Sequence, residues 1–158
     1  MEGLVEQCKR RTVESTKQFV TTFSFVPDDK LHWSPAPTAK SAMRIANHTA
    51  FYAGVFAEVI KTGRFPEMDR EKHAAARKAA EEADTTREEV IDLLRKNTDE
   101  VLAALDALTP ERIESMVETP AFPAPMVFFM ELPGGHTDGH ASQIDYLQTC
   151  WNDQEVHF

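Results

Sequence analysis

An apolar stripe with heptad spacing, between residues 91 and 108, most limits the folds open to this chain. Its positions repeat at intervals of three and four: Ile91, Leu94, Thr98, Val101, Leu105 and Leu108. A helix with this a/d pattern packs nearly parallel or antiparallel to neighbouring helices. A capping residue within residues 84–86, followed by Glu88 and Glu89, predicts where the helix begins, and Pro110 predicts its end. The stripe therefore predicts a helical bundle.

Three further segments have helical periodicity and complete a four-helix bundle. These helices are predicted over residues 2–24, 38–63 and 125–152. Thr38 is the predicted N-cap of the second helix, which should end near Gly63. A long loop with three prolines follows the first helix, and the charged, alanine-rich residues 64–83 are predicted to form a loop with one or two exposed helical turns. We expect an all-α fold, one four-helix-bundle domain spanning residues 1–158.

The last predicted helix contains Pro133-Gly134-Gly135 in its interior. Proline removes a backbone hydrogen bond and clashes with the preceding turn, and glycine weakens a helix. We therefore expect this helix to be kinked or interrupted just before His136. Such a break would open space beside the histidines described next.

Two histidines four residues apart, His136 and His140, lie on the apolar stripe of the last helix. The stripe comprises Met126, Phe129, Pro133, His136, His140, Ile144, Leu147 and Trp151. An apolar stripe at helical period faces the core, so both imidazoles should point inward. A buried polar group needs a partner. Each imidazole is then either hydrogen-bonded to a neighbour or bound to a metal ion, and the spacing alone leaves both interpretations open.

The second helix places another histidine, His48, on its inward stripe beside Tyr52. One metal ion would satisfy three inward histidines at once, whereas three separate core histidines would each need a partner. Gln143, three residues after His140, is a candidate for orienting a ligand or water, and Tyr52 and Asn47 flank His48. Of the remaining candidates, His32 is expected to be a surface or cap histidine, and His73 is expected to be solvated.

Composition excludes several functional classes. The formal net charge of −9 argues against binding nucleic acid or an anionic membrane surface. No run of about 18 apolar residues is present, and the acidic N-terminus is unlike a secretory signal. Two cysteines, Cys8 and Cys150, lie near opposite ends of the sequence and are expected to be free, largely buried thiols of a cytoplasmic protein.

Taken together, these residues resemble the DinB/YfiT-like superfamily. The matching pieces are the W-S-P-A-P segment (residues 33–37), the I-A-N-H segment (residues 45–48) and H-T-D-G-H-A-S-Q-I-D-Y-L (residues 136–147). The resemblance covers nearly the whole chain by element order. It implies an up-down-down-up four-helix bundle, often a homodimer, and a divalent metal, zinc or nickel, held by His48, His136 and His140. A continuous helix is more common in this family where the present chain has Pro-Gly-Gly.

The resemblance also implies a range of functions. Relatives include thiol S-transferases and a mycothiol-dependent isomerase, so a small-molecule substrate and a low-molecular-weight thiol are implied partners. We expect a metal-dependent enzyme, a thiol-dependent transferase or a hydrolase, although no catalytic residue beyond the metal site is evident. The alternatives are a non-catalytic, metal-dependent small-molecule binding or stress-response protein, and a bundle whose histidines are only structural.

Overall fold

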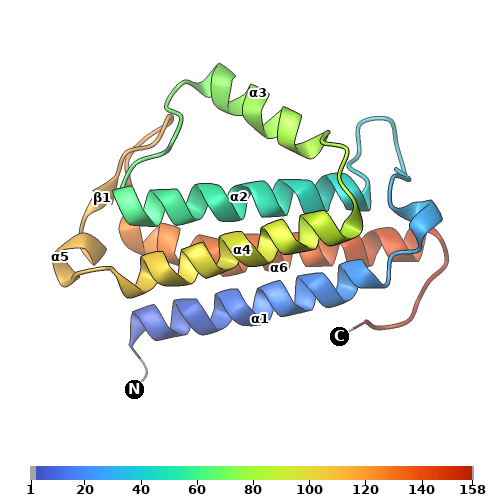
Figure 1. Cartoon of the computed structure of the whole chain (residues 1–158), viewed down its shortest axis with the longest axis horizontal. Helices are drawn as coiled ribbons and strands as arrows, with labels where there is room; N and C mark the ends of the chain where they lie inside the picture. The colour runs from blue at the N-terminus through green and yellow to red at the C-terminus, as the bar shows by residue number, and fades with distance from the viewer. Residues whose placement is uncertain (1–2, 158) are drawn as a thin grey trace.

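Four long helices lie side by side and form the bundle (Figure 1). The computed structural model describes residues 3–157. The long helices are α1 (Leu4–Ser24), α2 (Ala42–Thr62), α4 (Arg87–Asp106) and α6 (Met126–Cys150). The shorter elements are η1 (Asp28–Lys30), α3 (Arg70–Glu81), α5 (Pro110–Ile113), β1 (Met116–Val117) and β2 (Ala124–Pro125). The predicted all-α four-helix bundle, with a long loop after the first helix, is confirmed.

The helices do not neighbour each other in chain order. Helix α2 packs against α4 and α6, and α1 packs against the same two helices, so α1 and α2 occupy opposite corners. Figure 1 shows α1 and α6 running in one direction and α2 and α4 in the other. This up-down-down-up order requires a long return between α2 and α4, which α3 provides along the outer side of α2.

The bundle is filled by two clusters of buried apolar side chains. One lies around Phe19, Phe23 and Ile144, and the other around Ile60, Leu105 and Met130; the members of both come from all four long helices. The stripe that predicted the bundle supplies Leu94, Val101 and Leu105, each at most 1% exposed. Burial of such side chains stabilises the fold by about 1.5–3 kcal/mol each.

The helix termini follow local sequence signals, with one correction. Thr86 and Glu89 form a reciprocal capping box at the start of α4, as predicted. Gly63 ends α2 in the left-handed conformation, with φ of 76°. The predicted N-cap Thr38 is wrong, because Ser41 accepts the hydrogen bond from the Arg44 backbone N–H instead. Helix α2 therefore begins one turn later than expected.

The last helix was predicted to be kinked or interrupted before His136. Helix α6 is continuous through Pro133, so the interruption is wrong, and the kink stays a prediction. The missing N–H of Pro133 removes one backbone bond, but Pro133 and Gly134 are both buried against the rest of the bundle. A Cβ on Gly134 would lie 2.8 Å from Arg11 Cγ and 3.3 Å from the Arg11 backbone carbon. The glycine thus allows α6 to approach α1 closely, and this packing stabilises a helix that propensity alone would break.

Helix α3 corrects the prediction for residues 64–83, which gave the segment only one or two helical turns. It has 12 residues, begins at the N-cap Asp69 and packs on α2. Its alanines are mostly exposed, and its single buried residue is the charged Glu81. The charged segment is therefore not just a solvated surface.

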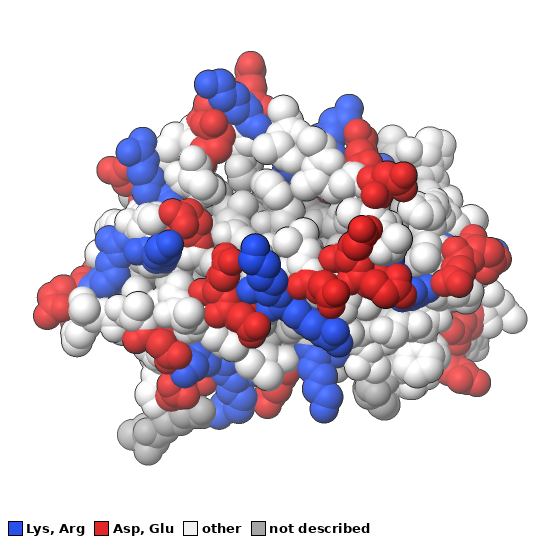
Figure 2. Space-filling view, in the orientation of Figure 1, with Lys and Arg blue, Asp and Glu red and all other residues white. Residues whose placement is uncertain are grey.

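The described surface fits an acidic protein. Figure 2 shows acidic and basic side chains interleaved over the visible face, with no separate basic region. Within residues 3–157, no helix is long and apolar enough to cross a bilayer. Cys8 and Cys150 are both free thiols; Cys8 is buried as expected, but Cys150 is exposed.

Candidate metal centre

Three histidines from two helices converge midway along the bundle. His48 lies on α2, and His136 and His140 lie one turn apart on α6. One ring nitrogen of each lies within 4.8 Å of the others. The Nε2 atoms of His136 and His140 are 3.1 Å apart, and the His48 ring centroid lies 5.2 Å and 4.7 Å from the centroids of those rings. The structure therefore brings together the three predicted ligands.

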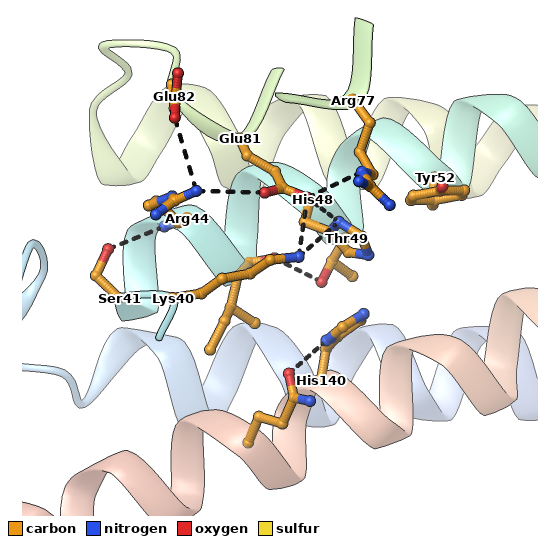
Figure 3. A network of polar contacts seen from close by, with 12 residues as sticks. Lys40, Ser41, Arg44, His48, Thr49, Tyr52, Arg77, Glu81, Glu82 and His140 are labelled. Carbon is orange, nitrogen blue, oxygen red and sulfur yellow. Dashed lines mark hydrogen bonds and ion pairs between the residues drawn. The ribbon is translucent and has the colours of Figure 1, made fainter. Parts of the chain in front are cut away.

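A buried carboxylate fixes the orientation of His48 (Figure 3). Glu81, from the last turn of α3, is 5% exposed, and its Oε1 lies 2.7 Å from His48 Nδ1. The same oxygen accepts a hydrogen bond of 2.9 Å from Lys40 Nζ. Lys40 Nζ also lies 3.2 Å from His48 Nδ1. Because the Lys40 ammonium only donates, Lys40 and His48 act as two donors that share Glu81 Oε1 as their acceptor.

This arrangement decides which nitrogen of His48 is available to a metal. Burial alone would raise the pKa of Glu81, but the hydrogen bonds from Lys40 and His48 outweigh it and lower the pKa below its usual value. Arg44 and Arg77 form further ion pairs with the carboxylate oxygens, at 3.6 Å and 3.7 Å. Because ionised Glu81 can only accept, His48 carries its proton on Nδ1 and presents the Nε2 lone pair.

His140 is oriented in a similar way by a neutral acceptor. Its Nδ1 lies 2.8 Å from Oε1 of Gln143, one turn along α6. The donor is therefore His140 Nδ1–H, which leaves Nε2 directed at His136. Gln143 was predicted to orient a ligand or water, and here it contacts one of the three histidines directly.

All three imidazoles are neutral near pH 7. Burial lowers the pKa of His48 to about 4, although the hydrogen bond to Glu81 opposes the shift. Burial, followed by the proximity of His140 and His48, lowers the pKa of His136 to about 3. Burial also lowers the pKa of His140. Neutral imidazole is the form that binds metals, so the site does not need to lose protons before a cation enters.

The flanking predictions have different outcomes. The Tyr52 ring packs on His48 and His136 at centroid distances of 4.7 Å and 5.2 Å and closes that side of the cluster. Asn47 does not face the histidines. Its amide donates to the Ala83 carbonyl and its oxygen accepts from Thr85, so it holds the chain that leaves α3.

His32 is exposed, as expected, but the prediction that His73 is solvated is wrong. His73 Nε2 lies 3.1 Å from the Tyr52 hydroxyl, and its ring packs near Phe51 and Phe65. This contact attaches the N-terminal half of α3 to α2. Burial lowers the pKa of His73, with Arg77 contributing.

The donor set fits a divalent transition metal. In a tetrahedral zinc site each zinc–nitrogen distance is about 2.0–2.1 Å, so two ligand nitrogens lie about 3.3 Å apart. The two Nε2 atoms on α6 are 3.1 Å apart, which is close to that value. Two of the three imidazoles donate their other N–H to an acceptor, as metal-bound histidines in proteins almost always do. The cluster therefore suggests a divalent metal bound through three nitrogens with at least one position left open.

A sequence comparison assigns the chain to a family. The sequence pattern of the DinB superfamily matches residues 11–144, which include all three histidines. The chain belongs to the DinB superfamily. No curated protein matches the sequence.

Solved structures agree on the fold of this DinB protein. A DinB-like protein from Bacillus subtilis is 18% identical, with 96% of each chain covered and a TM-score of 0.70. YfiT from Bacillus subtilis, described as "a probable metal-dependent hydrolase with an unusual four-helix bundle topology", is 15% identical over 93% of this chain and 87% of its own, with a TM-score of 0.74.

A mycothiol-dependent maleylpyruvate isomerase is also similar in structure. It is 13% identical, with a TM-score of 0.70, and the match covers 91% of this chain and 63% of the isomerase. At sequence identities this low, the structural similarity establishes the fold alone.

Sequence reasoning missed two residues of the centre, Glu81 and Lys40. A signal for Glu81 exists in the sequence. Glu81 and Glu82 end an alanine-rich helix, where the helix dipole disfavours acidic side chains unless they are paired. Lys40 lies in the proline-rich loop just before α2, where nothing in the spacing indicates its contact with Glu81.

Proposed function

We propose that this DinB protein is a metal-dependent enzyme whose divalent ion is held by His48, His136 and His140. The observation that supports the proposal most strongly is the convergence of three neutral imidazoles, two of them oriented through Nδ1 by Glu81 and Gln143. Without a metal, the pair on α6 is satisfied only when His136 donates its Nε2–H to His140 Nε2, 3.1 Å away. A shared cation would instead bind the lone pairs of both nitrogens at once.

The reaction we propose is transfer to or from a low-molecular-weight thiol, or hydrolysis. A divalent ion with an open position supplies Lewis acidity and activates a thiol or water as a nucleophile near neutral pH. The chain's own residues hold and shield it. Glu81 and Gln143 fix the tautomers of two ligands, and the Tyr52 ring covers one side of the cluster. Imidazole ligands suit zinc and nickel, and we propose one of these as the native metal.

Access to the centre supports a small-molecule substrate. A groove of about 570 Å³ reaches His140 and Gln143, within the usual size range of sites for small organic molecules. Its described lining offers no carboxylate that could act as a general base. That observation favours the second candidate, a non-catalytic metal-dependent small-molecule binding or stress-response protein.

Elemental analysis of protein purified without a histidine tag tests the metal centre. About one equivalent of zinc or nickel is expected in the wild type and much less in His136→Ala. Turnover of thiols with electrophilic partners, or of hydrolysable esters and amides, by the loaded wild type then separates an enzyme from a binder. Absence of metal, with none taken up on addition, would leave the structural interpretation of the histidines.

Two further expectations belong to this proposal. We propose a homodimer, which light scattering coupled to size-exclusion chromatography would test. We also propose a cytoplasmic location, where the free thiols Cys8 and Cys150 and a low-molecular-weight thiol partner would stay reduced. Fractionation of cells that produce the protein would test the location.

A further inference from the structure

The groove beside His140 has walls of two kinds. The described lining residues are Pro35, Ala39, Lys40, Ile45, His140, Ser142, Gln143, Tyr146 and Leu147. Most of them are apolar or present an aromatic ring, and Lys40 is the only one of these residues with a formal charge. The polar residues Lys40, His140 and Gln143 belong to the network around the histidine cluster. The groove is therefore apolar with a cationic and hydrogen-bonding end at the proposed metal centre.

The charge of Lys40 is only partly neutralised. Its partner Glu81 also accepts contacts from Arg44 and Arg77, so three cations share one buried carboxylate (Figure 3). Even with the more distant pair between Arg44 and Glu82, the group has three positive and two negative charges. This local excess of positive charge lies in a protein of net charge −9. An ammonium has three donors, and Lys40 is 32% exposed, so it can bind a further acceptor from the groove.

From these features we infer that the groove binds an organic carboxylate with an apolar body. The carboxylate contacts Lys40 at the end of the groove near His140, and the apolar body lies along Ile45, Leu147 and Tyr146. A neutral amide analogue still offers a carbonyl acceptor but lacks the negative charge, so its contact with the Lys40 ammonium is weaker than that of a carboxylate. This inference deepens the proposed function by naming its substrate class. Lys40 and the groove wall, however, belong to the chain, so their binding preference can be measured without metal.

The test compares a carboxylate with its neutral amide. Binding of 4-phenylbutanoate and 4-phenylbutanamide is measured by isothermal titration calorimetry, on chelator-treated protein and on zinc-loaded protein. The acid is expected to bind about tenfold more tightly than the amide to the wild type, because only the carboxylate sets a negative charge against the Lys40 ammonium. Lys40→Met should remove this preference and weaken binding of the amide much less than binding of the acid. Lys40→Arg, which keeps the charge, should retain most of it.

A matched control comes from the loop before α2. Lys30 is 32% exposed, like Lys40, and it forms an ion pair with Asp29, away from the groove lining. Lys30→Met should therefore keep the wild-type preference for the acid. Circular dichroism of each variant checks that the bundle is intact, and the amide affinity gives a second check on the groove in Lys40→Met.

The outcomes separate this inference from the metal proposal. Equal affinity for acid and amide, absence of binding by either, or a preference that survives in Lys40→Met would overturn the groove assignment. A preference seen only with zinc and unchanged in Lys40→Met would also overturn it while supporting the metal centre. A Lys40-dependent preference in protein that takes up no metal would support the groove and refute the proposed function.

Discussion

Glu81 should control metal affinity although it is not a proposed ligand. It is 5% exposed, and a single oxygen, Oε1, accepts from both His48 Nδ1 and Lys40 Nζ. Glu81→Gln keeps the shape and one carbonyl oxygen at this position but removes the charge. Loss of a hydrogen-bond partner behind a metal-bound histidine typically weakens metal binding 10- to 100-fold, which corresponds to about 1.4–2.7 kcal/mol. We expect Glu81→Gln near the lower end of that range and Glu81→Ala near the upper end, because alanine leaves His48 Nδ1–H without an acceptor.

Competition with a chromophoric chelator of known zinc affinity measures this effect. Glu82→Gln is the matched control, because Glu82 is the next residue, its side chain is 50% exposed and it pairs with Arg44 at 3.8 Å. It should change zinc affinity less than twofold. Gln143→Ala removes a neutral, exposed acceptor from His140 and should have a smaller effect than Glu81→Ala, since charge-assisted hydrogen bonds are roughly twice as strong.

The result that would refute this reasoning is a Glu81→Gln variant with wild-type zinc affinity and an intact helical spectrum. In that case Glu81 would serve only to attach α3 to α2. A loss of affinity in Glu82→Gln as large as in Glu81→Gln would also refute it, because the effect would then follow net charge rather than the contact with His48.

Three further predictions concern the whole fold. Chelation should lower the thermal midpoint by about 5–10 °C relative to protein at a free metal concentration of 100 times Kd, since binding at that level contributes about 2.7 kcal/mol; scanning calorimetry checks this. Metal-free protein should lose stability as the pH falls from about 6.5 toward 4, by up to about 1.4 kcal/mol per pH unit for each titrating histidine. The reason is that His48 and His136, with folded-state pKa values of about 4 and 3, take up protons on unfolding. Urea titrations at several pH values should show a smaller dependence of stability on pH in His136→Gln. Gly134→Ala should destabilise the fold by about 1–2 kcal/mol through its clash with Arg11, and it should leave zinc affinity unchanged because the Pro-Gly-Gly segment serves packing. Gly139→Ala, with open space at its Cβ, should stabilise the fold by up to about 1 kcal/mol.

The sequence predicted the convergence of the histidines because each lies on a stripe set by its own helix. A period of 3.6 residues places His136 and His140 on the stripe that includes Ile144, and places His48 on the inward face of α2. No long-range information is needed for that step. By contrast, the continuity of α6 depends on how Gly134 packs against Arg11 in α1, a contact that local propensity does not contain.

The sequence predicted too few helical turns for α3 for the same reason. Its alanines and charges form no apolar stripe, and its attachment depends on contacts with residues far away in sequence. Glu81 reaches His48 across 33 positions, and His73 reaches Tyr52 across 21. A pattern of hydrophobicity cannot reveal contacts that are polar and nonlocal.

The topology of the bundle explains why such a helix supports the centre. Because α2 and α4 run in the same direction, the chain must return along the outside of the bundle between them, and α3 is that return (Figure 1). Helix α3 lies along the outer side of α2 and ends beside the N-terminal third of that helix, where His48 lies. Its one buried side chain is the carboxylate that orients His48, so the contact that attaches α3 to the bundle is also the contact that prepares a ligand. Metal binding through His48 should therefore strengthen the attachment of α3, and loss of the metal should raise the rate of amide exchange in residues 70–81 more than in α4.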